Sequence, residues 1–206
     1  MALSQNKIYL ASKSPRRREL LRQIGVEFDL LLLRDVILRE PDVSEIVLPG
    51  ELPDVYVARV TQEKAIAAWN VMQTRRLPLR PVLAADTTVV INQQILGKPA
   101  NEEEALAMLR LLSGNRHQVL TSLAVHYQDN NFHCTQTSEV TFATLTEKQM
   151  HAYCATQEPY DKAGGYGIQG MAATFISHIS GSYSGIMGLP LFETTALLRQ
   201  AGIRVT

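Results

Sequence analysis

The sequence has few cysteines and no long apolar run. Only Cys134 and Cys154 occur in 206 residues, and they form no C-x-x-C pair. This usage predicts a reducing cytoplasm rather than a disulfide framework. No segment approaches the ~18 apolar residues of a membrane-spanning helix, and the N-terminus lacks the apolar run of a signal peptide. We therefore expect a cytoplasmic protein without a membrane partner.

The chain also lacks net charge. Lys plus Arg and Asp plus Glu balance at 20 each, so no overall basic field favours nucleic acid as a partner. A small anionic ligand would need a local cluster of cations instead. The apolar share of 46% is enough to bury a core without disulfides. We predict a single domain over residues 1–206, with two lobes around a cleft as one way to build it.

Apolar periodicity alternates between strand-like and helix-like segments. Strands are predicted at 8–11, 28–33, 117–127, 132–142 and 174–179, with a β-hairpin over 81–96 that turns near Asn92 and Gln93. Helices are predicted at 14–24, from 56 to before 78, and at 101–112, 146–156 and 190–201. The intervening segments, including 34–53 and 180–188, are predicted to be loops. This order predicts an α/β protein with a mixed, twisted sheet and flanking helices.

The first predicted helix carries three cations at the wrong end. Ser14 and Pro15 are typical of a helix start, yet Arg16, Arg17 and Arg18 occupy its first turn. The helix dipole places about half a positive charge there, so cations are unfavourable unless an anion binds. A phosphate bound by backbone amides, a nearby serine and the arginines would resolve the conflict. The alternative is a solvated basic turn. If Arg16 and Arg17 bind phosphate, removing Arg17 should leave the stability of the ligand-free protein unchanged or slightly improved.

Asp86 is the second unusual residue. It lies in AADTTVV, whose other residues suit a half-buried strand, where Asp is rare and costly to bury without a partner. Either it bonds to something structural, or it faces a metal ion or a water. The small neighbours on both sides leave space beside it, which favours a functional role.

Several familiar motifs fail on inspection. Lys98 follows a glycine, but a P-loop would need glycine where Asn92 stands. Without that motif, Lys98 is predicted to be a solvent-exposed lysine in a turn. The G-x-G-x-x-G run at 165–170 has no strand before it and no helix after it, which excludes the dinucleotide-binding interpretation. The five histidines lack zinc spacing, and the nucleophile-elbow pattern at 181–185 has Tyr183 where serine is needed. The remaining inventory of oxygen ligands and cations suits Mg²⁺-assisted phosphate chemistry.

Four segments together resemble the Maf family of nucleotide pyrophosphatases. They are IYLASKSPRRRELL, LAADTTVV followed by ILGKP, LSGNRHQVLT, and EPYDKAGGYGIQG, and they occur in the family's order over nearly the whole chain. The last segment is similar to the branch that acts on dTTP and UTP rather than the branch that acts on 7-methyl-GTP. The resemblance implies a fold like that of inosine triphosphatases with a central cleft, a divalent cation (Mg²⁺ or Mn²⁺), hydrolysis between the α- and β-phosphates, and a homodimer.

The resemblance also assigns roles to particular residues. It implies that Asp86 is the catalytic base and, together with Glu45, a metal ligand. It links Arg16, Thr87 and Gln169 to the choice of substrate. Other positions that it places in the cleft, as substrate-binding residues, are Ser12, Arg17, Lys64 and Lys98. Two features depart from the family pattern: Lys13 stands where a small residue is commoner, and Glu45 follows a longer segment from Leu33 to Pro41.

These residues predict a mechanism without a covalent intermediate. A water attacks the α-phosphorus, Asp86 accepts its proton, and pyrophosphate leaves while the cationic side chains offset the charge of the triphosphate. The alternative is a regulator of cell division that binds nucleotides without hydrolysing them, since the same side chains would bind in either case. Gln169 is predicted to recognise uracil or thymine through its amide.

Overall fold

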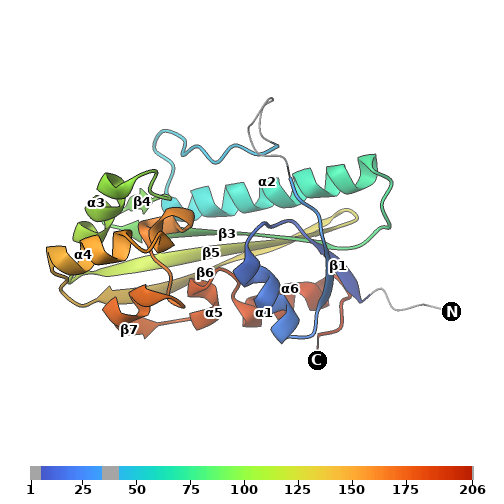
Figure 1. Cartoon of the computed structure of the whole chain (residues 1–206). Helices are drawn as coiled ribbons and strands as arrows, with labels where there is room; N and C mark the ends of the chain where they lie inside the picture. The colour runs from blue at the N-terminus through green and yellow to red at the C-terminus, as the bar shows by residue number, and fades with distance from the viewer. Residues whose placement is uncertain (1–5, 34–41, 206) are drawn as a thin grey trace. The chain divides into compact units, whose positions relative to one another are not determined.

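The computed structural model describes residues 6–33 and 42–205 (Figure 1). The chain divides into two compact units. The first contains Met1–Asp86, Thr121–Gln136 and Gly188–Thr206, and the second contains Thr87–Leu120 and Thr137–Met187. The first unit therefore includes both ends of the chain, and the second is made of two internal segments.

Three strands contribute to both units: β3 (Val82–Ile91), β5 (Arg116–Tyr127) and β6 (Asn130–Phe142). The first unit adds β1 (Lys7–Leu10), α1 (Pro15–Gln23), β2 (Glu27–Leu30), α2 (Pro53–Thr74) and α6 (Leu191–Gln200). The second adds β4 (Gln94–Leu96), α3 (Glu102–Leu112), α4 (Glu147–Cys154), β7 (Ile176–Ser180) and α5 (Tyr183–Ile186). Between α4 and β7 lie three short 3₁₀ helices: η1 (Glu158–Asp161), η2 (Ala163–Gly165) and η3 (Met171–Phe175).

The seven strands found in the described residues form one sheet in the order β2-β1-β3-β5-β6-β7, with β4 paired to β3. Strand β1 pairs in parallel with β2 and β3, whereas β3–β4 and β6–β7 are antiparallel. The prediction of an α/β fold with a mixed sheet is confirmed.

In the first unit, α2 covers one side of the strands. Its buried Ala65, Ala68, Trp69 and Met72 pack with apolar side chains of the sheet, including Val82 of β3. Figure 1 shows α2 along one side of these strands and α1 and α6 on the other. This packing fixes the rotation of α2 about its axis, and therefore which of its polar side chains face the ends of β1 and β3 in this unit.

The core of the second unit joins α3 and α4 to the sheet and to the glycine-rich segment. Leu109 of α3, Tyr153 of α4 and Phe142 of β6 are completely or almost completely buried in it. Tyr166, which follows η2, packs against the edge of Phe142 with ring centroids 4.9 Å apart. The glycine-rich segment is thus anchored by aromatic packing at Tyr166.

Most predicted elements are present with small shifts at their ends. The hairpin turn lies at Asn92 and Gln93, whose φ angles of 50° and 64° are the left-handed values that a two-residue turn requires. The prediction of a loop through 180–188 is wrong in part, because Ser182 caps the short helix α5 by accepting from the Gly185 amide. Residues 42–52 contain turns but no helix or strand, as predicted, and residues 34–41 of the predicted loop lie outside the described residues.

Candidate functional site

The start of α1 is a compact hydrogen-bonded turn. Ser14 caps the helix by accepting from the Arg17 amide, and the Ser12 hydroxyl oxygen accepts from the Ser14 amide at 3.2 Å. Ser12 is buried, and its hydroxyl oxygen lies 3.2 Å from the Arg17 Nη1 that donates to it. The segment between β1 and α1 therefore presents amides, a hydroxyl and arginines together, which are the groups that bind phosphate at a helix start.

Arg17 is anchored by a distant part of the chain. Its Nε donates to the carbonyl oxygen of Gly188 at 2.7 Å, across 171 positions of sequence. Burial lowers the pKa of the Arg17 guanidinium, while the charges of Asp86 and Glu45 act in the opposite direction. The simple picture of a solvated basic turn is therefore wrong for Arg17. Arg16 is half-buried in the same turn.

Three charged side chains from separate segments meet in the first unit. Lys64 Nζ of α2 lies 2.6 Å from Asp86 Oδ1 at the end of this unit's part of β3, and 2.7 Å from Glu45 Oε1. Lys64 and Asp86 are each only 16% exposed, whereas Glu45 is 57% exposed. Two carboxylates thus converge on one cation, with the positive charge of Arg17 close enough to interact with both.

Tyr56 of α2 adjoins this cluster, although the sequence analysis did not single it out as a site residue. Its hydroxyl donates to the main-chain oxygen of Glu45 at 3.1 Å. Burial raises the pKa of Tyr56 to about 12, and the negative charges of Asp86 and Glu45 add to the effect. Tyr56 lies two turns before Lys64 on the same helix, and a buried tyrosine needs a partner for its hydroxyl, which is the signal that could have marked it.

Thr87, Lys98 and Gln169 belong to the second unit. Thr87 is half-buried in β3. Lys98 follows β4 and is exposed, as predicted, but it lies in a connecting segment rather than a turn. Gln169, which was predicted to recognise the base, is exposed between η2 and η3. The G-x-G-x-x-G run follows a 3₁₀ helix instead of a strand, so rejecting the dinucleotide-binding interpretation is confirmed.

The loop around Gln169 is braced from inside by Glu158. One carboxylate oxygen accepts from the Tyr153 hydroxyl at 3.0 Å, and the other from the Met171 amide at 2.9 Å. A Cβ on Gly170 would collide with this carboxylate, so a larger residue there would push the Glu158 side chain aside. Lys162 adds a bond to the Glu158 carbonyl oxygen at 2.6 Å. An exposed glutamine is therefore carried on a well-connected loop.

The carboxylate pair fits a hard divalent cation in its chemistry. Mg²⁺ and Mn²⁺ prefer oxygen ligands, and Glu45 and Asp86 already direct oxygens at the positive charge of Lys64. In residues 6–33 and 42–205, however, no group of three or more His, Cys, Asp or Glu is placed to hold a metal. The remaining ligands would have to come from phosphate oxygens or water.

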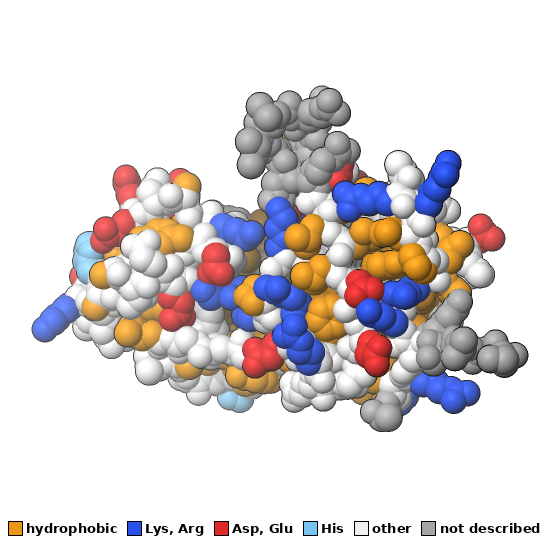
Figure 2. All heavy atoms as spheres, turned by 45° about the vertical axis from the view of Figure 1, so that its right-hand side comes forward, with side chains coloured by type: hydrophobic (Ala, Val, Ile, Leu, Met, Phe, Trp, Pro, Cys, Tyr) orange, Lys and Arg blue, Asp and Glu red, His pale blue; other side chains and the backbone are white. Residues whose placement is uncertain are grey.

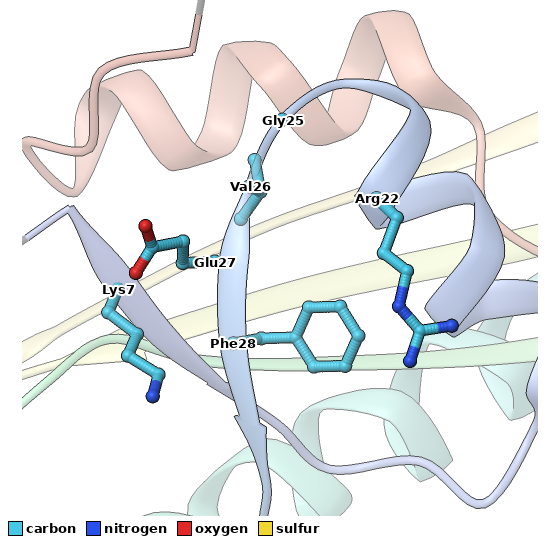
Figure 3. Close-up of a pocket in the computed structure, with 6 residues that line it drawn as sticks. All are labelled: Lys7, Arg22, Gly25, Val26, Glu27 and Phe28. Carbon is cyan, nitrogen blue, oxygen red and sulfur yellow. The ribbon is translucent and has the colours of Figure 1, made fainter.

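A separate hollow of about 410 Å³ lies where α1 is followed by β2 (Figure 3). It is lined by Lys7, Arg22, Gly25, Val26, Glu27 and Phe28, and the Arg22 side chain points toward the Phe28 ring. Its lining contains none of the residues that the sequence predicted for the site.

Taken together, the helix start and the Lys64 cluster define an α/β protein of the class that binds anionic, phosphate-like groups beside paired carboxylates. The family model described as Maf-like protein matches residues 7–201, so the chain belongs to the Maf family, as the resemblance predicted.

Relatives cover nearly the full length of the chain. The dTTP/UTP pyrophosphatase of Ralstonia nicotianae is 55% identical over 197 residues, covering 95% of this chain and 94% of its own. The dTTP/UTP pyrophosphatase of Nitrosospira multiformis is 52% identical over 205 residues, covering 100% and 99%. The one from Dechloromonas aromatica is 47% identical over 198 residues, covering 96% and 98%.

Among solved structures, the Staphylococcus aureus Ham1 protein is similar with a TM-score of 0.41 and 16% identity, over 66% of this chain and 72% of its own. A similarity at that level supports no conclusion about function. No helix in the described part of the chain combines the length and apolar character needed to cross a membrane.

Proposed function

We propose that this protein hydrolyses dTTP and UTP to the nucleoside monophosphate and pyrophosphate. One observation carries the proposal: Glu45 and Asp86 converge on Lys64 in the same unit as the arginine-bearing start of α1. The relatives named dTTP/UTP pyrophosphatase at 47% to 55% identity support the same activity.

The triphosphate end is the part of the substrate that the first unit suits. Ser12, Arg16 and Arg17 supply donors and positive charge at the helix start, and Lys64 supplies a further ammonium group. Because Arg17 is held by the Gly188 carbonyl and Ser12, its charge is in place before the ligand arrives. Preorganised charge of this kind stabilises a transition state better than charge that must reorient.

Asp86 is the proposed general base. The oxygen of an attacking water bonds to the α-phosphorus, the bond from that phosphorus to the bridging oxygen breaks, and pyrophosphate leaves with that oxygen. The water's proton passes to Asp86, so no covalent protein intermediate forms. Lys64, which now donates to Asp86 at 2.6 Å, holds the carboxylate in a defined position.

Glu45 and Asp86 are the proposed ligands of Mg²⁺ or Mn²⁺. Such a cation, when bound, neutralises phosphate charge and draws electron density from the phosphorus. With two carboxylates from the protein, we expect weak metal binding alone and tighter binding with a triphosphate, which supplies further oxygens. Calorimetry with Mn²⁺, with and without a dTTP analogue that resists cleavage, tests this.

Gln169 is the proposed reader of the base, and Thr87 and Lys98 are proposed to contact substrate. A primary amide offers an acceptor for the N3–H of uracil or thymine and a donor for a ring carbonyl. A fixed amide orientation leaves polar groups unpaired when cytosine enters, which is the source of strong discrimination. The Glu158 contacts described above hold the loop that carries Gln169, and a second partner for the amide, from the glycine-rich segment or Thr87, is proposed to fix its orientation. The 5-methyl group adds only ~0.8 kcal/mol if buried, so dTTP and UTP should both react.

The decisive experiment measures pyrophosphate release from dTTP, UTP, CTP, ATP and GTP, with and without Mg²⁺ or Mn²⁺. We expect metal-dependent release with kcat/KM for dTTP and UTP well above the other three, and a smaller gap over CTP in Gln169→Ala. If the protein binds dTTP but releases no pyrophosphate, the proposed enzymatic function is wrong and the alternative of a nucleotide-binding regulator is supported. A preference for purines would remove Gln169 as the base reader.

We also propose that the protein is cytoplasmic and works as a homodimer, without nucleic acid or membrane partners. The usage of only two cysteines supports the first point, and similarity to the Maf family motivates the second. Size-exclusion chromatography with light scattering tests the dimer.

A further inference from the structure

Glu45 sits on a segment that apolar burial cannot hold in place. Residues 42–52 form no helix or strand, and Ile46, Val47, Leu48 and Leu52 are all exposed, Ile46 by 73%. Apolar side chains that stay in water contribute little to ordering a loop. Polar bonds must therefore fix the segment if the Glu45 carboxylate is to stay 2.7 Å from Lys64 Nζ.

Arg59 of α2 supplies most of these bonds. Its Nε and Nη2 donate to the two carboxylate oxygens of Glu51 at 2.6 and 2.9 Å, a two-point contact. The Glu51 carboxylate is only 5% exposed and also accepts from the Leu48 amide at 3.0 Å. The Arg59 guanidinium lowers the pKa of Glu51 to about 2, helped by the Leu48 amide. The same Nη2 donates to the Ile46 carbonyl oxygen at 3.0 Å.

Tyr56 completes the attachment next to the carboxylate. Its hydroxyl donates to the main-chain oxygen of Glu45, one residue before the carbonyl that Arg59 binds. The Arg59 guanidinium also lies over the Tyr56 ring, 5.7 Å from its centroid. Tyr56 and Arg59, one turn apart on α2, thus donate hydrogen bonds to two successive carbonyl oxygens and to the shielded Glu51 carboxylate of the same segment.

We infer that Tyr56, Arg59 and Glu51 are positioning residues that hold Glu45 against Lys64 and Asp86. The inference rests on the proposed function, because it gives Glu45 a task in hydrolysis. None of the three is assigned contact with substrate: they act through Glu45. The Arg59–Glu51 contact is bidentate and shared with main-chain groups, so it fixes the geometry of the segment more closely than a single-point surface ion pair does.

Glu51→Gln is the most informative variant, and Glu63→Gln is its matched control. The glutamine keeps the size of Glu51 but removes the charge that Arg59 binds. Glu63 also faces Arg59, at 3.4 Å from Nη1, but it lies on α2 itself and is 43% exposed. Removing the Glu63 charge in Glu63→Gln should leave residues 42–52 attached to α2 and the activity unchanged.

Two readouts separate positioning from general destabilisation. Hydrogen exchange measured by mass spectrometry should show faster exchange in residues 42–52 of Glu51→Gln, with the thermal midpoint nearly unchanged. The kcat for dTTP should fall about tenfold to a hundredfold, the scale on which small misplacements act. Tyr56→Phe, which loses only the hydroxyl, should show a smaller change in the same direction.

The double variant Glu45→Gln/Glu51→Gln tests whether Glu51 affects hydrolysis through Glu45. If Glu51 acts through Glu45, the double variant should be no slower than Glu45→Gln alone. Losses that multiply would overturn the inference, and so would unchanged exchange in residues 42–52 of Glu51→Gln. If the wild-type protein releases no pyrophosphate, the proposed function fails, while the exchange measurement still tests how the segment is held.

Discussion

Asp86 can be tested against another aspartate that is also held by cations. In Asp86→Asn the amide cannot accept the water's proton, so kcat should fall by about 10²-fold or more. Asp29 of β2 is the matched control, because it pairs with Lys7 of β1 and with Arg80, which precedes β3, and it has no proposed role in hydrolysis. The measurement is pyrophosphate release together with the thermal midpoint of both variants. Turnover near the wild-type value in a folded Asp86→Asn protein would remove Asp86 from the mechanism.

Arg17 has a structural role that the helix-dipole argument did not predict. From the dipole alone, Arg17→Ala should leave the ligand-free protein as stable as before or slightly more stable. The structure predicts a loss of stability instead, because Arg17 Nε donates a hydrogen bond to the carbonyl oxygen of the buried Gly188. Losing a charged donor to a buried acceptor costs about 1–3 kcal/mol.

We therefore expect Arg17→Ala to lower the free energy of unfolding by that amount and to raise KM for dTTP roughly tenfold, as loss of one charged contact implies. Urea denaturation and steady-state kinetics measure the two effects. Arg18→Ala, at the next position of the same turn, is the control and should change KM little. An Arg17→Ala protein of unchanged stability would show that the Gly188 bond contributes nothing net.

At the scale of elements, the 3₁₀ helix η2 depends on a glycine. Gly164 has a φ of 71°, and a Cβ there would lie 2.8 Å from Val89 Cβ on β3 of the same unit. The Cβ of Val89 is fixed to the strand backbone and cannot turn away as the end of a long side chain could. Gly164→Ala combines left-handed strain with overpacking, so we expect a loss of about 2–5 kcal/mol.

Gly25 provides the control for this prediction. It has almost the same φ, 69°, but nothing lies within 4 Å of its added Cβ. Gly25→Ala should therefore show the backbone strain alone, about 1 kcal/mol. Denaturant unfolding of both variants compares them, and equal losses would contradict the role assigned to Val89.

At the scale of the whole molecule, His117 makes stability depend on pH. It is buried, its Nε2 lies 2.7 Å from the Tyr166 hydroxyl, and burial lowers its pKa to about 4. An unfolded chain has a histidine pKa near ~6.5, so between these values the unfolded state binds more protons. Stability contributed by His117 is therefore present above pH ~6.5 and is lost as pH falls toward about 4.

The full effect amounts to about 3 kcal/mol, from a difference of about 2.5 pKa units. Unfolding free energies of the wild type from pH 7.5 to 4.5 should fall more steeply than those of His117→Gln. A slope in His117→Gln equal to that of the wild type would contradict this source of acid sensitivity.

The distribution of charge over the molecule agrees with the balanced composition. On the face drawn in Figure 2, Lys and Arg side chains are interspersed with Asp and Glu rather than gathered into one continuous basic surface. Attraction of a triphosphate must then come from local groups such as Arg17 and Lys64.

The sequence alone determined most of the elements and the family. Periodicity located most strands and helices, and Ser14 marked a helix start that the structure shows as an N-cap. The motifs around Arg16, Asp86 and Gln169 were enough to predict the Maf family. These signals are local, because capping, turn formation and amphipathic spacing depend on residues within a few positions of one another.

Only the tertiary structure decided which side chains meet. Lys64 bridges Glu45 and Asp86, residues from three separate segments, and Arg17 bonds to Gly188 across 171 positions. The attachment of the Glu45 segment to Tyr56 and Arg59 is likewise absent from any local pattern. Such contacts follow from how helices rotate when their apolar faces pack on the sheet, and that rotation is set by the whole core rather than by the residues that touch.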